Sequence, residues 1–444
     1  MAPETPISYR NLVIYEVYVR NHGPNGTFKD VEADLPRLKQ MGVDVVWFMP
    51  IHPIGQLNKK GSLGCPYSIR DYRSVNPEYG TYQDFTRLVN QAHALDMKVM
   101  IDVVYNHTAH DSVLVREHPE FFHQDAQGRP FTTVPAWSDV IDLKHPHPGL
   151  TRYLVDTLAG WVQAGVDGFR CDVASLVPIE FWLQARAEVE KVKPGVIWLA
   201  ESVHASFVDD RRRHGLLGLS DSELYAAFDM CYDYDIWPVF RHVVKGNLPV
   251  LRFLELLRFQ DCIYPANYVK MRCVENHDNE RIMALAPTHE QALAWTAFTA
   301  FNQGAFMIYG GQEAGADHTP SLFDIDKIEW KDYPLQEFLG KLAHLKKDPA
   351  QRDGQFILLA DEPAVQAAWQ HPTQGLYGVF NVKARKGNAS VQLEDGVYPE
   401  LLYGGTVTVK NGKMALPTEA AILRCKTLQN LQMLHSPMLD SEIH

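Results

Sequence analysis

Residues 166–173 read VDGFRCDV, a short apolar run that carries a carboxylate, Asp172, near its end. Similar runs rich in Val, Ile, Phe and Tyr recur along the first 310 residues, with segments of helical spacing between them. Eight strands that alternate with helices favour a (β/α)8 barrel, the TIM-barrel class of α/β fold. The predicted strands are 12–19, 43–50, 98–105, 166–173, 196–201, 226–232, 270–276 and 305–310.

Helices are predicted where apolar residues recur with a period near 3.6. These segments are 31–41, 82–95, 150–164 and 180–192, and Asp30 is the expected N-cap of the first. Residues 292–309 are free of charge over a length that could span a membrane. Polar residues interrupt this run, so we expect a buried helix followed by a buried strand and no contact with a membrane.

Two segments depart from the alternation of strand and helix. A polar stretch of about 40 residues follows the third strand, which is too long for an ordinary βα loop and indicates a short inserted subdomain, here called the B domain. Beyond residue 349, short strands alternate with Gly, Asn and Asp turns, as in an antiparallel β-domain. The predicted organisation is a barrel over 1–107 and 148–349, an insertion over 108–147, a C-terminal β-sandwich over 350–425, and a surface-docked or frayed tail over 426–444.

Composition limits the classes of partner. The chain has 444 residues, of which 46% are hydrophobic and 22% charged, as in globular proteins. Its 42 Lys and Arg against 54 Asp and Glu give a net charge of -12, which argues against nucleic acid and anionic membranes and leaves neutral ligands open. The six cysteines form no C-x-x-C motif, and we expect reduced thiols. The first residues have no basic and apolar signal segment, so we expect a cytoplasmic protein.

Carboxylates stand at the ends of three predicted strands. Asp172 ends the fourth strand, Glu201 the fifth, and Asp278 follows the seventh. Active sites of such barrels lie at the carboxyl ends of the strands. Arg170 lies on the same face as Asp172 and favours its ionised form, whereas Glu201 follows an apolar run that raises its pKa. One ionised and one protonated carboxyl is the combination that glycoside hydrolysis requires.

Other polar residues admit a purely structural interpretation. Asp102, His107 and His277 fall at the same barrel rim and add hydrogen-bonding groups to it. We expect His145 and His147 to be loop residues rather than metal ligands, because no further ligand lies near them in the sequence. Residues 211–213, three arginines that follow two aspartates, are expected to form a solvated loop.

The strand-end motifs resemble those of the α-amylase superfamily, glycoside hydrolase family 13. DVVYNH at 102–107, GFRCD at 168–172, AES at 200–202 and ENHD at 275–278 are similar to the four signatures of the family. Supporting matches are GVDVVWFMPIHP at 42–53, YSIRDYRSVNPEYGT at 67–81 and GAFMIYGGQE at 304–313. Each motif is short, but seven in the family's order form a specific signal.

The resemblance implies a role for each matching residue in a retaining double displacement. Asp172 would be the nucleophile, Glu201 the general acid/base and Asp278 the stabiliser of the transition state. Arg170 would orient Asp172, and Asp102 would hold Arg170 in place. The residues expected to bind the sugar are Tyr67, as a stacking platform, His107 and His277.

The sequence also departs from the family pattern. Many α-amylases carry Lys-His after the nucleophile, where this chain has Ser175 and Leu176, and this weakens the case for a long cleft and ordinary endo-amylase specificity. Asn106 matches a family calcium ligand, and Asp142 lies where the inserted domain offers another. No cofactor is required by these motifs; calcium at Asn106 and Asp142 is the one metal that the resemblance suggests, with Asn106 as a plain hydrogen-bonding residue the stronger interpretation.

We therefore expect an α-amylase-like glycosidase that cleaves α-1,4-glucosidic bonds in maltodextrins or malto-oligosaccharides. A transglycosylase, a sucrose-type phosphorylase or a glucosyl isomerase would use the same covalent intermediate, because these enzymes differ in the acceptor that resolves it. A non-catalytic sugar-binding protein is a remote alternative, since such relatives lose one or more of the three acids. The sequence leaves linkage preference, endo or exo action and oligomeric state open.

Overall fold

The computed structural model describes residues 4–436 and residue 439. Eight parallel strands close into a barrel in the order β1-β10-β9-β8-β7-β6-β3-β2, which confirms the predicted fold class. Every barrel strand lies inside a predicted range, because each buried strand is a nearly continuous apolar run. The barrel strands are β1 (Val13–Val17), β2 (Val45–Phe48), β3 (Lys98–Val103), β6 (Gly168–Cys171), β7 (Ile197–Ala200), β8 (Met230–Tyr232), β9 (Lys270–Arg272) and β10 (Ala305–Tyr309).

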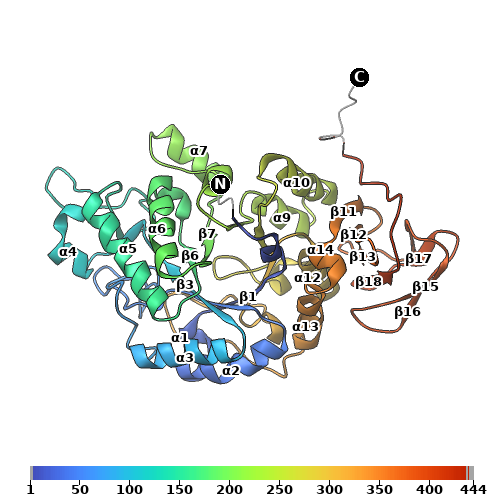
Figure 1. Ribbon diagram of the computed structural model, residues 1–444, viewed down its shortest axis with the longest axis horizontal. Coiled ribbons are helices and arrows are strands. Elements are labelled where there is room, and N and C mark those ends of the chain that lie inside the picture. Colours follow the sequence, from blue (N-terminus) through green and yellow to red (C-terminus); the bar gives the residue numbers. More distant parts are fainter. Residues whose placement is uncertain (1–3, 437–438, 440–444) are drawn as a thin grey trace.

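Helices surround the barrel strands (Figure 1). The first long helix begins earlier than predicted, because Thr27 is the N-cap and Asp30 is the N3 residue of a capping box, so the assignment of Asp30 as N-cap was wrong. The helices of the barrel are α1 (Val19–His22), α2 (Phe28–Gln40), α3 (Tyr82–Ala94), α5 (Pro148–Gln163), α6 (Ile179–Val192), α7 (Ala205–Arg213), α8 (Asp221–Leu224), α9 (Trp237–Val244), α10 (Val250–Ile263), α11 (Ile282–Leu285), α12 (His289–Phe301) and α13 (Gln336–Leu345).

The polar stretch after β3 folds against the barrel rim. Its base is the antiparallel pair of β4 (His107–Ala109) and β5 (Val140–Asp142), in which His107 is paired with Asp142. Between them lie α4 (Val113–Glu117) and a short 3-10 turn, and α4 is at the left edge of Figure 1. The β4 and β5 pairing brings the inserted segment next to the ends of β3 and β6, where the strand-end carboxylates are.

The C-terminal region is an antiparallel β-domain that begins after α14 (Pro349–Asp353). It has one four-stranded sheet, β11-β12-β13-β18, and two two-stranded sheets, β14-β17 and β15-β16, with a shared apolar core. Its strands are β11 (Gln355–Ala360), β12 (Val365–Gln370), β13 (Gly375–Phe380), β14 (Asn388–Ser390), β15 (Gly396–Pro399), β16 (Thr406–Val409), β17 (Lys413–Ala415) and β18 (Ala420–Cys425).

The charge-free run 292–309 joins this domain to the barrel. It forms most of α12 and then β10, and α12 is buried on every side over its last ten residues. In Figure 1 the C-terminal strands lie beside α12 and α13. Trp369 Nε1 donates to the carbonyl of Phe301 at 2.7 Å across this contact. None of the helices in the described part of the chain has the length and apolarity that a bilayer crossing needs.

The tail was expected to be docked or frayed. Residues 426–436 contain no helix or strand, yet Leu428 and Leu434 are buried and Leu434 N donates to Leu358 O at 2.8 Å, so this part is docked on the β-domain. Residues 437–438 and 440–444 lie outside the described residues. The six cysteines are free thiols.

Candidate active site

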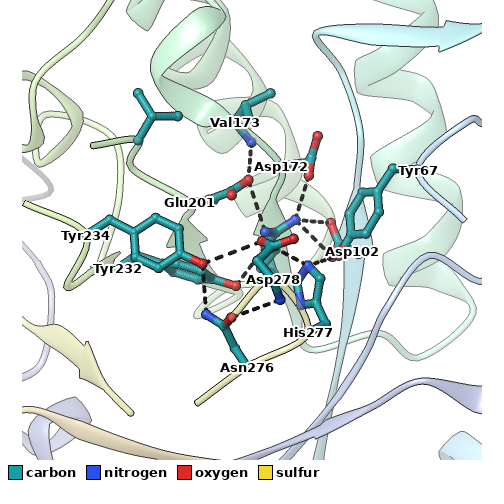
Figure 2. A network of polar contacts seen from close by, with 12 residues as sticks. Tyr67, Asp102, Asp172, Val173, Glu201, Tyr232, Tyr234, Asn276, His277 and Asp278 are labelled. Carbon is teal, nitrogen blue, oxygen red and sulfur yellow. Dashed lines mark hydrogen bonds and ion pairs between the residues drawn. The ribbon is translucent and has the colours of Figure 1, made fainter. Parts of the chain in front are cut away.

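One buried guanidinium, that of Arg170, is the centre of the rim where β3, β6 and β7 end. The strand register places Asp102 directly beside Arg170. Arg170 Nη1 donates to both oxygens of Asp102 at 3.0 Å and to Asp172 Oδ1 at 2.8 Å, and Nη2 lies 3.0 Å from Glu201 Oε2. Figure 2 shows the carboxylates of Asp102, Asp172 and Glu201 pointing toward this shared centre. The structure thus brings four of the residues predicted for the site into contact.

Asp172 and Glu201 are buried acids whose pKa values are both raised. Burial raises the pKa of both carboxyls to about 7, although the charge of Arg170 opposes the rise. Neighbouring acids titrate as a pair, and the proton stays on the one whose charge is less stabilised. Arg170 donates a hydrogen bond to Asp172, whereas Nη2 faces Glu201 without hydrogen-bond alignment. We therefore assign the charge to Asp172 and the proton to Glu201.

Glu201 is held in place by the backbone. Its Oε2 accepts from Val173 N at 2.7 Å, and this bond leaves Oε1 to carry the proton. Val173 has a φ of 34°, in the left-handed region that a β-branched residue rarely adopts. This strained turn directly follows Asp172 and aims an amide at Glu201, so the β6 end positions both carboxyls at once.

Asp278 and His277 form a second charged pair across the rim. His277 Nδ1 contacts the buried carboxylate of Glu16, and Nε2 lies 2.8 Å from the Tyr67 hydroxyl and 3.2 Å from Asp278 Oδ2. Tyr67 donates its own proton to Asp102 Oδ2 at 3.0 Å, so His277 must donate from both ring nitrogens. Burial opposes this charge, but Asp278 and Glu16 outweigh it and raise the pKa of His277 well above its usual value.

The same contacts keep Asp278 ionised. Although desolvation favours the neutral acid, the charge and hydrogen bond of His277 lower the pKa of Asp278 to about 2. The Asp278 side chain remains 40% exposed, so it presents a negative charge to the open cleft. The ring of Tyr67 stacks on that of His277, with centroids 5.3 Å apart, and Tyr67 lines the cleft; its role as a stacking platform for the sugar stays a prediction.

His107 has the opposite protonation state. Burial lowers its pKa to about 4. Its Nδ1 faces the Asn106 amide nitrogen at 3.1 Å, which leaves Nε2 as the protonated nitrogen, 3.8 Å from Asp172 Oδ2. The ring lies 5.3 Å from that of Trp137, a residue of the inserted segment. A neutral His107 can donate to a sugar hydroxyl beside Asp172 without neutralising it.

Asp172, Glu201, His107, His277 and Asp278 all line one open cleft. On one side Val173, Leu176, Val203 and Val208 form an apolar cluster against Trp137 and Phe207. Of the two positions where many α-amylases have Lys-His, Leu176 joins this cluster and Ser175 accepts from Val203 N at 3.2 Å. The cleft is lined by Lys60, Cys65, Tyr67, His107, Trp137, Asp139, Val140, Asp172, Val173, Glu201, His277, Asp278, Leu322 and Phe323. Lys60 is paired with Asp139 at 2.9 Å, so its charge is balanced.

Sequence reasoning missed two supporting residues. Glu16 is fully buried in β1 behind His277, and a single acid inside the apolar run VIYEV was the signal that could have found it. Tyr232, at the end of β8, accepts from Arg170 Nε at 3.1 Å. Its position at a strand end, like that of the three acids, was the available signal.

His145 and His147, which were predicted to be loop residues rather than metal ligands, both form hydrogen bonds with the backbone. His145 Nε2 contacts the Tyr105 carbonyl at 2.8 Å, and His147 Nδ1 accepts from Leu150 N at 3.2 Å as the N-cap of α5. The prediction of a solvated loop at residues 211–213 was wrong. These residues end helix α7, and Arg211 is buried and donates to Thr133 Oγ1 and Leu217 O, because apolar α7 residues pack on the cleft wall.

Calcium remains a prediction. Asp142 Oδ2 accepts from the backbone and hydroxyl of Thr133, while its buried Oδ1 has no partner among the described residues, which suits a cation ligand. The Asn106 amide nitrogen contacts His107. Within the described residues, no three His, Cys, Asp or Glu side chains cluster as a metal centre would require. Asn106 and Asp142 would hold the ion through oxygen atoms, and calcium titration of the chelated protein tests this.

Comparisons with known proteins agree with this geometry. The family model described as "Alpha amylase, catalytic domain" matches residues 14–137 and 122–356, and that of the "Bacterial Alpha amylase C-terminal domain" matches 357–423. An α-amylase from Lactobacillus plantarum is 44% identical, with a TM-score of 0.90 over 94% of this chain and 100% of that one. The maltogenic α-amylase AmyB from Thermotoga neapolitana is 34% identical, with a TM-score of 0.84 over 94% and 99%.

Among curated relatives, the α-1,4-glucan:maltose-1-phosphate maltosyltransferase of Cereibacter sphaeroides is 35% identical over 74% of this chain and 57% of its own length. The chain thus spans a little more than half of that protein. The α-amylase MalA of Haloarcula japonica is 28% identical over 78% of this chain and 50% of its own length. The seven motifs, the barrel and these matches agree: the chain is an enzyme of the α-amylase family, glycoside hydrolase family 13, whose reaction is glycosyl hydrolysis or transfer.

Proposed function

We propose that the protein is a retaining glycoside hydrolase that cleaves α-1,4-glucosidic bonds in malto-oligosaccharides. The observation that carries this proposal is the sharing of Arg170 by Asp172 and Glu201. Retaining enzymes hold their two carboxyls about 5 Å apart, whereas inverting enzymes need roughly 6.5–9.5 Å to admit a water between them. Asp172 and Glu201 contact neighbouring nitrogens of the Arg170 guanidinium, and this arrangement fits the spacing of a retaining enzyme.

In the first step, the ionised Asp172 attacks the anomeric carbon and the glycosidic carbon–oxygen bond breaks. Glu201 gives its proton to the departing oxygen, so the leaving sugar is released as a neutral alcohol. Positive charge grows on the ring as the bond breaks, and the anionic Asp278 stabilises it. The neutral His107 and the charged His277 donate hydrogen bonds to hydroxyls of the same ring.

In the second step, Glu201 is a base. It takes a proton from a water molecule, whose oxygen attacks the anomeric carbon and displaces Asp172. The bond to Asp172 breaks with its electron pair returning to the carboxylate, and both carboxyls regain their starting states. Two inversions at one carbon leave the product with the anomeric configuration of the substrate.

The choice of substrate rests on the charge of the cleft and on the relatives. The cleft contains the acids Asp172, Glu201 and Asp278, and Lys60 is neutralised by Asp139, so a neutral sugar is favoured over a phosphorylated one. Two of the solved structures that this chain is similar to are described as an α-amylase and a maltogenic α-amylase. A cytoplasmic location is part of the proposal, and cell fractionation tests it.

The test is a time course of products from maltoheptaose, with the Asp172→Asn variant as control. We expect shorter oligosaccharides of α configuration, and a fall in turnover of several orders of magnitude in the variant. Full activity in Asp172→Asn would refute the assignment of the nucleophile. Products of β configuration would refute the retaining mechanism.

Transfer to a sugar acceptor is the second candidate. It is favoured by the maltosyltransferases among the curated relatives, which act from maltose 1-phosphate by their name. The apolar wall around Trp137 and Phe207 offers surfaces on which a second sugar could stack. Products longer than maltoheptaose, or release of phosphate from maltose 1-phosphate in the presence of a glucan, would replace hydrolysis with transfer in this proposal.

A further inference from the structure

The segment after β8, with the sequence YDYD at 232–235, turns one tyrosine toward the cleft. Asp233 accepts from Arg272 at 2.7 Å and Asp235 accepts from Lys270 at 2.9 Å, so both aspartates are tied to basic residues of β9. The chain turns at residues 233–236, and Tyr234, between the two aspartates, faces the rim, where its hydroxyl is 3.5 Å from Asp278 Oδ2 (Figure 2).

Two amide groups fill the lone pairs of the Tyr234 hydroxyl. Asn276 Nδ2 donates to it at 2.8 Å and Asn279 Nδ2 at 3.1 Å. The orientation of each amide is set by a group that can only donate. Asn276 Oδ1 accepts from the backbone N of Asp278 at 3.0 Å, and Asn279 Oδ1 accepts from Trp237 Nε1 at 2.8 Å. Each Nδ2 must then face the tyrosine, and neither amide can accept its proton.

The hydroxyl has one proton left to donate. Its acceptor is Asp278 Oδ2, at 3.5 Å. This distance is at the long limit for a hydrogen bond, so the contact is a weak one. The direction of the bond is determined all the same, because the two amides exclude the alternatives.

The ring of Tyr234 cannot move away. The imidazole of His204 stacks on it with centroids 4.8 Å apart, and His204 Nδ1 contacts the Tyr234 carbonyl at 3.0 Å. The rings of Tyr232 and Trp237 lie 4.9 Å and 6.0 Å away on other sides. A phenol clamped in this way is a rigid donor, whereas Asp278 is 40% exposed and could otherwise turn into solvent.

We propose that Tyr234 is a positioning residue for the reaction, which aims the Asp278 carboxylate at the sugar and stabilises its charge at Oδ2, the oxygen that His277 also contacts. This inference rests on the proposed function only in that Asp278 must be ionised and stationary when the glycosyl-enzyme forms. It holds whether water or a second sugar resolves that intermediate, because both reactions share the first step.

The test is the release of 4-nitrophenol from 4-nitrophenyl α-maltoside, which reports the first step irrespective of the acceptor. Tyr234→Phe removes the hydroxyl and keeps the ring. We expect kcat/KM to fall about tenfold, the size of a weak hydrogen bond to a charged group. The acidic limb of its pH profile should stay in place, because the raised pKa of Asp172 sets that limb and the pKa of Asp278 lies far below it.

Three further variants separate positioning from a merely structural effect. In an Asp278→Asn background, Tyr234→Phe should change the rate by less than about twofold, because there is no charge left to stabilise. Tyr264→Phe is the matched control: its hydroxyl donates to the half-buried Asp235 at 2.8 Å, and we expect wild-type kinetics. Asn279→Ala frees one lone pair of Tyr234 and should cause a smaller fall in the same direction.

These variants distinguish positioning of Asp278 from a general loss of structure. A wild-type rate in Tyr234→Phe would overturn the proposal, as would the same fall with and without Asp278. Should Tyr234→Phe melt far below the wild type, Asn279→Ala decides, and a wild-type kcat/KM there also overturns the proposal. Failure of hydrolysis as the proposed function would show instead as transfer products from the wild type, with the effect of Tyr234 intact.

Discussion

Replacing Arg170 with lysine tests the central feature of the site. The guanidinium uses Nη1 for Asp102 and Asp172, Nη2 for Glu201 and Nε for Tyr232. A lysine side chain ends in one ammonium nitrogen on a flexible aliphatic chain, so it cannot reproduce the planar arrangement of the three guanidinium nitrogens. At best it keeps the contacts to the two aspartates and loses those to Glu201 and Tyr232.

The expected size of the effect follows from these contacts. The hydrogen bond from the charged guanidinium to the Tyr232 hydroxyl contributes about 1.5–3 kcal/mol, and the contact to Glu201 adds less because it lacks hydrogen-bond alignment, so Arg170→Lys should lower the free energy of unfolding by roughly 3 kcal/mol. If Asp172 loses its fixed orientation to a similar extent, kcat/KM falls about a hundredfold. The basic limb of the pH profile should move to higher pH, because Arg170 lowers the pKa of Glu201 and a weaker contact lowers it less.

The assay is kcat/KM for 4-nitrophenyl α-maltoside against pH, with the free energy of unfolding from denaturant titration. Arg281→Lys is the matched control. Arg281 is equally buried and donates to Glu275 at 2.6 Å and to Gly310 O at 2.7 Å, so it should lose similar stability with no shift of the basic limb. Wild-type kinetics in Arg170→Lys, or the same shift in both variants, would refute the reasoning.

Three other predictions concern separate parts of the molecule. Glu16→Gln removes an anionic partner of His277 and lowers its pKa, so activity measured against pH should decline as pH rises through the new value and recover at lower pH; an unchanged profile would contradict the role of Glu16. Glu201→Gln should slow cleavage of maltoheptaose by about 10²–10⁴, yet react nearly normally with α-maltosyl fluoride, whose leaving group needs no proton; equal losses on both substrates would count against Glu201 as the acid. Trp369→Phe leaves the buried Phe301 carbonyl with only the long bond from Gln351 Nε2 at 3.4 Å and should cost about 1–2 kcal/mol in thermal unfolding, without a change in KM.

Much of the fold was predictable because the barrel strands are buried on both faces. Each one, such as β3 or β6, therefore reads as an apolar run, and its carboxylate stands out at the end. Helix starts were harder. Thr27 and Asp30 bond reciprocally in a capping box, and either residue type is a good N-cap on its own, so local sequence could not decide between them.

The family motifs could be placed in the site, but their chemical states could not. His107 and His277 are the same residue type at equivalent strand ends, yet one is neutral and the other charged. The difference is the neighbour: an amide nitrogen of Asn106 beside one, and the carboxylates of Glu16 and Asp278 beside the other. Arg211 shows the same limit, since its burial depends on packing of α7 against the cleft wall.

By itself the sequence determined the order of strands and helices and the positions of the three acids, because apolar periodicity and strand ends are local properties. Only the tertiary structure decided which acid keeps a proton, which histidine is charged and which way the Tyr234 hydroxyl points. These properties depend on electrostatic contacts between residues far apart in the chain, such as Glu16 and His277, which are separated by 261 positions. A barrel brings such residues within hydrogen-bond distance, and no local pattern encodes their pairing.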